Sequence, residues 1–223
     1  GDDNVRIHAH ARGLSTNAWA MRNSSLDTGS GNDTVHLRAS TQAGAFDPAY
    51  GALNSSVVLG DGQDSLHIGA NANGNTTDTI AAFGVLDSTI STGADDDRVQ
   101  IRTTAANRLG LAEAIGLDAS SLETEGGDDH INLHAGAYGH NTQAQALHES
   151  EVITGTGADS LRLKAEARGN TTDTIAAHGA LDSTINTGAD DDRVMIGASA
   201  VNRNGYAEAI GLDNSSLDTE SGD

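Results

Sequence analysis

The sequence has no cysteine, a single proline and very few aromatic residues. Its 223 residues include one Trp, three Tyr and two Phe, which together make up 3% of the chain. The absence of cysteine excludes a disulfide framework, thiolate metal sites and thiol catalysis. The shortage of large side chains disfavours a wide globular core and favours a narrow one lined by Ala, Val, Leu and Ile.

Basic residues and long apolar runs are also scarce. Twelve Lys and Arg stand against 32 Asp and Glu, for a formal net charge of −20. This charge argues against nucleic-acid partners and anionic membranes, and it points toward cations. The longest apolar run, Ile80–Leu86, is broken by Gly84 and is too short to span a bilayer. We therefore expect no membrane insertion, and any export signal would lie outside this segment.

The most informative feature that is present is an internal repeat. Residues 75–101 read NTTDTIAAFGVLDSTISTGADDDRVQI, and residues 170–196 read NTTDTIAAHGALDSTINTGADDDRVMI. Within this long repeat, a shorter pattern, T-G-x-G-x-D-x-[VLI]-x-[LI], recurs in steps of 30 to 33 residues. We call its Asp residues the repeat Asp residues: Asp3, Asp33, Asp64, Asp97, Asp129, Asp159 and Asp192. Seven such units fill the chain.

Each unit has the periodicity of β-strands. After Asp33, for example, Val35 and Leu37 alternate with His36 and Arg38, which is typical of a half-buried strand. A second apolar column precedes the Gly-rich turn: Leu26, Val57, Ile90, Leu122, Val152, Ile185 and Leu217. A weaker apolar segment, such as 79–86, lies between the two. We therefore predict three short strands in each unit.

These features predict an all-β fold, a parallel β-solenoid (β-helix) of about seven coils with roughly 32 residues each. One such unit cannot bury its apolar face alone, so the coils must stack. We treat residues 1–223 as a single array. Because the array starts and stops at the same phase of the repeat, we expect either a segment of a longer array or a unit that polymerises head to tail.

The turn motif resembles the hemolysin-type calcium-binding (RTX) repeat, G-G-x-G-x-D-x-U-x. The closest copies are TGSGNDTVH from Thr28, LGDGQDSLH from Leu59 and TGTGADSLR from Thr154. In that family, turn carbonyls and the Asp carboxylate form a Ca²⁺ site between stacked coils. The resemblance covers about nine residues of each unit and implies that the repeat Asp residues are calcium ligands. Departures from the motif are Asp95 and Asp190 in place of its second Gly, and Glu125 in place of its first.

Electrostatics favour a bound cation independently of this resemblance. Stacked carboxylates about 4.8 Å apart repel by about 0.9 kcal/mol in water and by about 3.5 kcal/mol at an effective dielectric of 20. Further candidate ligands in the same turns are Asp61, Asp95, Asp96, Asp128, Asp190 and Asp191. Such oxygen ligands suit Ca²⁺ better than transition metals. The alternative is that each Asp only caps its turn, with its carboxylate in solvent.

The outward side of the strand after each repeat Asp is rich in basic and polar residues. Its two columns are Arg6, His36, His67, Gln100, Asn132, Arg162 and Met195, then His8, Arg38, Gly69, Arg102, His134, Lys164 and Gly197. A basic face beside an acidic edge could support lateral association or contact with acidic polysaccharide; the alternative is a solvated face. The irregular stretch 43–53, with Phe46, Pro48 and Tyr50, is a second candidate binding feature.

An enzyme is not expected, because the same candidate residues recur in every unit, whereas acid–base chemistry needs groups in different environments. The sequence favours an extracellular structural or adhesive solenoid that binds Ca²⁺ at the cell surface, in a sheath or in a fibre. Self-association would be by axial stacking or lateral bundling. A spacer or stalk in a large secreted adhesin is the main alternative, and a polysaccharide-acting β-helix enzyme is a weaker one.

Overall fold

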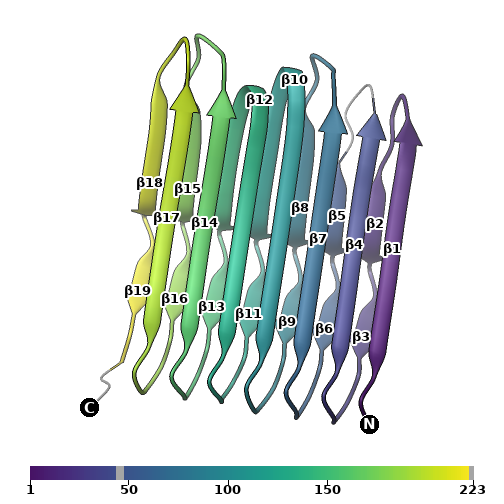
Figure 1. Ribbon diagram of the computed structural model, residues 1–223, viewed down its shortest axis with the longest axis vertical. Coiled ribbons are helices and arrows are strands. Elements are labelled where there is room, and N and C mark those ends of the chain that lie inside the picture. Colours follow the sequence, from purple (N-terminus) through teal and green to yellow (C-terminus); the bar gives the residue numbers. More distant parts are fainter. Residues whose placement is uncertain (44–47, 221–223) are drawn as a thin grey trace.

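The computed structural model describes residues 1–43 and 48–220, and these residues form a parallel β-solenoid of about seven coils (Figure 1). Every regular element in the described part of the chain is a β-strand. No helix there could therefore cross a membrane. The predicted fold class and the repeat of about 32 residues are confirmed.

Each coil contributes a first strand, a second strand and a three-residue third strand. The first strands are β1 (Asn4–Gly13), β4 (Thr34–Ala43), β7 (Ser65–Gly74), β14 (Ser160–Gly169) and β17 (Arg193–Asn202). The second strands are β2 (Ala18–Arg22), β5 (Ala49–Leu53), β8 (Ile80–Leu86), β15 (Ile175–Leu181) and β18 (Ala207–Asp213). In two central coils the first and second strands run together as β10 (Arg98–Asp118) and β12 (His130–His148). The third strands are β3 (Ser25–Asp27), β6 (Ser56–Val58), β9 (Thr89–Ser91), β11 (Ser121–Glu123), β13 (Glu151–Ile153), β16 (Thr184–Asn186) and β19 (Ser216–Asp218). The first strands, at ten residues, are longer than the short strands expected.

Neighbouring coils pair in register, so equivalent residues form straight columns along the solenoid. Val35, for example, pairs with Val5 on one side and with Leu66 on the other. All of the strand pairs are parallel. The columns inferred from the repeat are therefore real rows of side chains in the structure.

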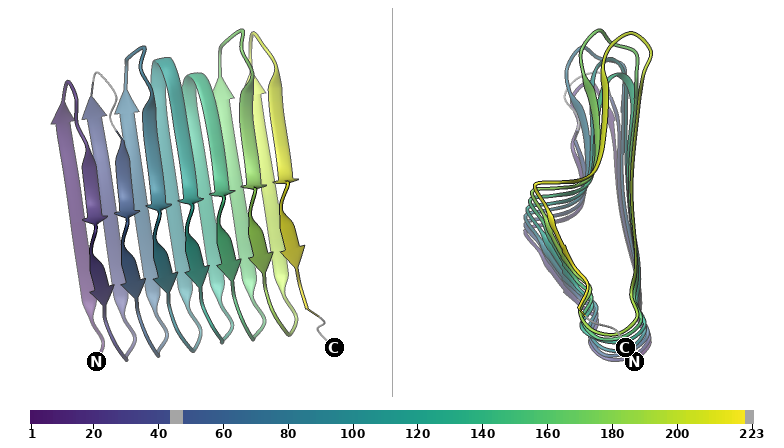
Figure 2. Two further views of the ribbon diagram at one scale, coloured as in Figure 1. Left: turned by 180° about the vertical axis from the view of Figure 1, so that it is seen from behind. Right: turned by 90° about the vertical axis from the view of Figure 1, so that its left-hand side faces the viewer.

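The interior has a wide part and a narrow part, visible in the end-on view of Figure 2. Large aliphatic side chains such as Leu37, Leu66 and Ile101 fill one cluster. Alanines such as Ala39, Ala70 and Ala105 fill the other, where the first and second strands approach each other. A core of this shape needs no aromatic side chains, which accounts for their scarcity.

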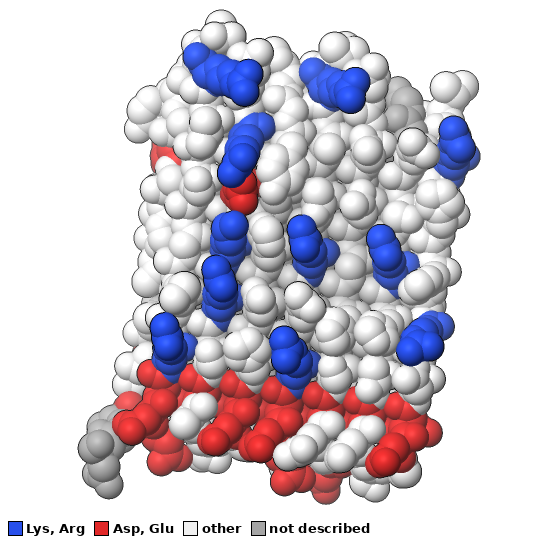
Figure 3. Space-filling model, in the orientation of Figure 1, with Lys and Arg blue, Asp and Glu red and all other residues white. Residues whose placement is uncertain are grey.

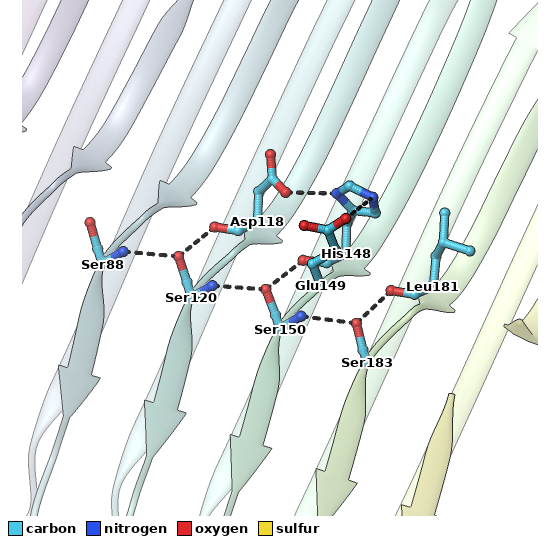
Figure 4. Close-up of polar contacts among 8 residues, drawn as sticks. All are labelled: Ser88, Asp118, Ser120, His148, Glu149, Ser150, Leu181 and Ser183. Carbon is cyan, nitrogen blue, oxygen red and sulfur yellow. Dashed lines mark hydrogen bonds and ion pairs between the residues drawn. The ribbon is translucent and has the colours of Figure 1, made fainter. Parts of the chain in front are cut away.

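A serine ladder stabilises the corner between the second and third strands (Figure 4). Ser120 Oγ accepts the backbone N–H of Ser88, one coil earlier, at 3.1 Å and donates to the carbonyl of Asp118 at 2.6 Å. The same pair of bonds recurs from coil to coil at Ser55, Ser88, Ser150 and Ser183. The residue before each Ser is left-handed, with φ between 46° and 50°: Asn23, Asn54, Asp87, Ala119, Glu149, Asp182 and Asn214. A groove of about 1010 Å³ runs along this corner, but these Ser hydroxyls are already engaged.

Candidate functional site

The repeat Asp residues form a ladder inside the turn edge of the solenoid. Asp33, Asp64, Asp97, Asp129 and Asp159 are only 1–3% exposed, while Asp3 and Asp192 in the terminal coils are less buried. Their direction follows from the strand pattern. Asp33 lies two residues before Val35 and four before Leu37, so it lies on the same, inward side. The carboxylates of the five inner coils therefore do not extend into solvent, whereas Asp3, in the first coil, is exposed.

One oxygen of each carboxylate from the second coil onward accepts a backbone N–H of the coil before it. Asp97 Oδ1 accepts the backbone N–H of Asp64 at 2.8 Å, and Asp129 Oδ1 accepts that of Asp97 at 2.8 Å. The same bond joins the other steps of the ladder at 2.7–3.0 Å. The repeat Asp residues thus do cap the turns, as one sequence interpretation held, but they do so between coils and inside the structure.

The second carboxylate oxygen, Oδ2, is left without a partner. It is buried and makes no hydrogen bond in Asp33, Asp64, Asp97, Asp129, Asp159 and Asp192. The hydroxyls of Thr124 and Thr154 lie close enough to lower the pKa of Asp129 and Asp159, but they donate to carbonyl oxygens one coil further on, at 3.2 and 2.9 Å. The Thr92 hydroxyl, beside Asp97, is buried and also makes no hydrogen bond. A buried, unpaired carboxylate oxygen is costly, so it calls for a proton or a cation.

Burial makes these carboxyl groups hard to ionise. Desolvation, reinforced by the carboxylates of neighbouring coils, raises the pKa of Asp97 to about 7. The pKa values of Asp64 and Asp129 rise to about 6 for the same main reason. The pKa of Asp159 is also raised. Backbone N–H groups, and the Thr side chains beside Asp97, Asp129 and Asp159, oppose these shifts but do not cancel them.

The turns keep one backbone shape despite the substitutions in the motif. Each turn has two residues with positive φ, such as Gly60 at 98° and Gly62 at 133°. Asp95, Glu125 and Asp190 take the place of glycine with φ of 82°, 64° and 91°. The three departures from the motif therefore preserve the turn, at the cost of a left-handed conformation that non-glycine residues resist.

The remaining predicted ligands lie on the other side of the turn. The exposed group comprises Asp61, Asp95, Asp96, Asp128, Asp190 and Asp191, and it contributes to the acidic band at the turn edge in Figure 3. Asp96 and Asp97 are adjacent but face opposite sides. Asp96 Oδ1 accepts the N–H of Asp128, and Asp128 Oδ1 accepts that of Ala158, both at 2.9 Å. The thirteen candidates thus divide into an inner ladder and an outer band.

The inner ladder fits a hard cation better than a soft one. In the described part of the chain, no group of three or more His, Cys, Asp or Glu side chains is arranged to hold a metal ion. A metal at the ladder would therefore need backbone carbonyls as well as Oδ2 atoms, as the resemblance implies. Carboxylate and carbonyl oxygens are the ligands that Ca²⁺ prefers.

Comparisons with protein families, with curated proteins and with solved structures found no match for this chain. The similarity to the calcium-binding repeat therefore remains a prediction from the nine-residue motif.

Sequence reasoning missed an aromatic stack on the second strands. The rings of Trp19 and Tyr50 lie 6.5 Å apart and those of Tyr50 and Phe83 lie 5.2 Å apart, nearly parallel. The three residues are paired in register. Because the rings cover one another, Tyr50 is part of a structural stack. Of the predicted binding feature at 43–53, Phe46 lies outside the described residues and Pro48 is buried.

The strongest candidate for acid–base chemistry is a pair that does not repeat. His148 Nδ1 lies 2.7 Å from Asp118 Oδ1 (Figure 4). Burial raises the pKa of Asp118, and His148 opposes that rise. Glu113, whose pKa burial also raises, is on the same strand, β10. The observed contact is a hydrogen bond between side chains of neighbouring coils, so it has a structural explanation and carries no argument for catalysis.

Proposed function

We propose that this chain is an extracellular structural or adhesive β-solenoid whose inner Asp ladder binds Ca²⁺, so that folding depends on the cation. The observation that carries the proposal is the row of buried Oδ2 atoms without partners. Turn carbonyls would complete the coordination between successive coils. The outer acidic band would hold cations more weakly, because its carboxylates are exposed to water.

The cost of leaving the ladder bare supports this proposal. A carboxyl whose pKa rises from 3.8 to about 7, as at Asp97, loses about 4 kcal/mol of stability when it is ionised. Asp64 and Asp129 each lose about 3 kcal/mol by the same reasoning. A loss of this size at one residue is already a large part of the stability of an ordinary domain, about 5–15 kcal/mol. At neutral pH a cation bound at the ladder would recover much of this loss, which supports the proposal.

The proposed location and role follow from that partner. In the family that the turn resembles, calcium is scarce inside the cell and plentiful outside, so such a chain would fold after export. A regular rod with few irregular loops suits a surface layer, sheath or fibre in which solenoids associate with one another. A spacer in a large adhesin is the alternative, and electron microscopy in calcium would separate long filaments from discrete rods.

The test is thermal unfolding followed by circular dichroism in EDTA, in calcium chloride and in magnesium chloride. A ligand at one hundred times its Kd stabilises the folded state by about 2.7 kcal/mol per site, so several sites would shift the melting temperature by many degrees. We expect the largest shift in calcium. Equal melting temperatures in EDTA and calcium would refute the proposal.

A further inference from the structure

The outward face of the first strands carries an excess of positive charge. Nine of the twelve Lys and Arg residues project from it: Arg6, Arg12, Arg38, Arg98, Arg102, Arg162, Lys164, Arg168 and Arg193. Figure 3 shows Lys and Arg side chains spread over this face, above the acidic band. Among the outward side chains of the described first strands, counting only residues 98–107 of β10 and 130–139 of β12, Glu166 is the one carboxylate. Lys164, at 3.2 Å, and Arg168, at 2.6 Å, already neutralise it.

A trough crosses this face along the solenoid axis. One hollow of about 620 Å³ is lined by His36, Arg38, His67 and Arg102, among others. The lining of a second hollow, of about 220 Å³, includes Asn132, His134, Arg162 and Lys164. The two hollows share Gln100 and Arg102 in their walls, so they lie next to each other in a row, which we call the trough, from the first coil, at His8, to the sixth, at Lys164.

Gly69 forms the floor of the larger hollow. It pairs in register with Arg38 on one side and Arg102 on the other, so two guanidinium groups flank a position with no side chain. A Cβ atom placed on Gly69 would meet nothing closer than Arg38 Cγ, at 3.8 Å. The hollow therefore exists because glycine occupies this position in the column.

Lys164 pairs with Glu166, but Arg38 and Arg102 make no ion pair among the described residues. The rings of His36 and His67 stack with centroids 4.7 Å apart. Burial, with His36 and Arg98 nearby, lowers the pKa of His67, and no carboxylate is near enough to oppose the shift. Guanidinium groups held open in this way are well suited to carboxylate or sulfate groups, which they bind through two parallel hydrogen bonds.

We propose that this trough binds an acidic polysaccharide laid along the solenoid axis. Its Lys and Arg side chains recur at every second coil, at Arg38, Arg102 and Lys164, roughly 9.6 Å apart, and so match a polymer with regularly repeated acid groups. Neutral donors and acceptors, including Asn71, Gln100, Thr104 and Asn132, lie between the cations and suit sugar hydroxyls. The stacked Trp19, Tyr50 and Phe83 project from the second strands and so offer no base-stacking platform at the trough.

The experiment measures binding of fluorescent dextran sulfate and polygalacturonate, with neutral dextran and duplex DNA as comparisons. Gly69→Gln blocks the trough without changing charge, and Gly197→Gln is the matched change in the last coil, where nothing lies within 4 Å. The double variant Arg38→Gln/Arg102→Gln removes the flanking cations, and Arg108→Gln removes an exposed cation outside the trough. Circular dichroism establishes that each variant is folded.

We expect Gly69→Gln and the double arginine variant to bind at least one of the acidic polysaccharides at least tenfold more weakly than the unsubstituted protein does. The affinities of Gly197→Gln and Arg108→Gln should stay close to that of the unsubstituted protein. Binding no tighter than to neutral dextran, or equal losses in the control variants, would overturn the proposal. Equal affinity for DNA would show a non-specific polyanion site and also overturn it. If the trough variants abolish self-association of the protein, the basic face binds the acidic edge of a second copy of the chain, and the polysaccharide proposal is overturned. The Asp ladder is untouched by these variants, so calcium binding is tested separately.

Discussion

Replacing Asp97 with asparagine tests the inner ladder in a single position. In the unsubstituted protein, Asp97 Oδ1 accepts the backbone N–H of Asp64 at 2.8 Å. The asparagine side chain has the same size as the carboxylate and keeps an Oδ1 atom that can accept this bond. It removes the negative charge and the Oδ2 atom that has no partner. The effect on stability should therefore depend on whether calcium is present.

In EDTA at pH 8, the variant should be more stable than the unsubstituted protein. Removal of an ionised Asp97 relieves about 4 kcal/mol, while the unpaired amide N–H₂ that replaces it costs about 1–3 kcal/mol. The net gain is then about 1–3 kcal/mol. In saturating calcium the order should reverse, because the variant lacks one ligand. Urea unfolding in both buffers gives the two free energies directly.

Asp96→Asn is the matched control, because Asp96 is the next residue but is exposed on the opposite side of the turn. It should change the free energy of unfolding by no more than about 0.5 kcal/mol in either buffer. If calcium stabilises Asp97→Asn as much as the unsubstituted protein, the ladder is not the calcium site. If Asp97→Asn is less stable in EDTA at pH 8, the estimated cost of the buried charge is wrong.

Three further predictions concern the ladder and the serine corner. In EDTA the free energy of unfolding should rise as the pH falls from 8 toward 4, because carboxyls with a raised pKa bind protons more tightly in the folded state than in the unfolded state. Urea titrations at several pH values measure this free energy. A value that stays constant or falls as the pH is lowered would contradict the prediction. Ala119→Asn should stabilise the protein by about 0.5–1 kcal/mol, because Ala119 has φ of 46° and Asn adopts this left-handed conformation at the same corner of three other coils. An unchanged free energy of unfolding in urea would contradict this. Ser120→Ala should destabilise by about 1–3 kcal/mol, since the buried N–H of Ser88 loses its acceptor, whereas Ser121→Ala should have little effect in the same assay.

Much of the fold could be predicted because the seven repeated units can be aligned with one another within the single sequence. Equivalent residues such as Val35 and Leu66 occupy equivalent positions, and stacking in register places them together. The continuous strands β10 and β12 could not be foreseen, because whether the chain bends between two strands depends on packing against neighbouring coils. The length of the first strands was underestimated for the same reason.

The candidate site was predicted in position but not in orientation. The alternation that places Val35 inward also places Asp33 inward, yet a charged residue in a turn is normally expected in solvent. Only the structure shows the bond from the preceding coil that holds Asp33 inside. The aromatic stack was missed because Trp19, Tyr50 and Phe83 lie in the weakest part of the repeat, where neighbouring units differ in sequence and length.

The central claim is that the buried oxygens of the inner ladder hold calcium. A crystal structure of the protein grown in calcium chloride tests it most directly. We predict metal density about 2.3–2.6 Å from the Oδ2 atoms of successive ladder residues such as Asp64 and Asp97. An ordered ladder with no metal beside Oδ2, or with calcium bound only at outer residues such as Asp96 and Asp128, would contradict it.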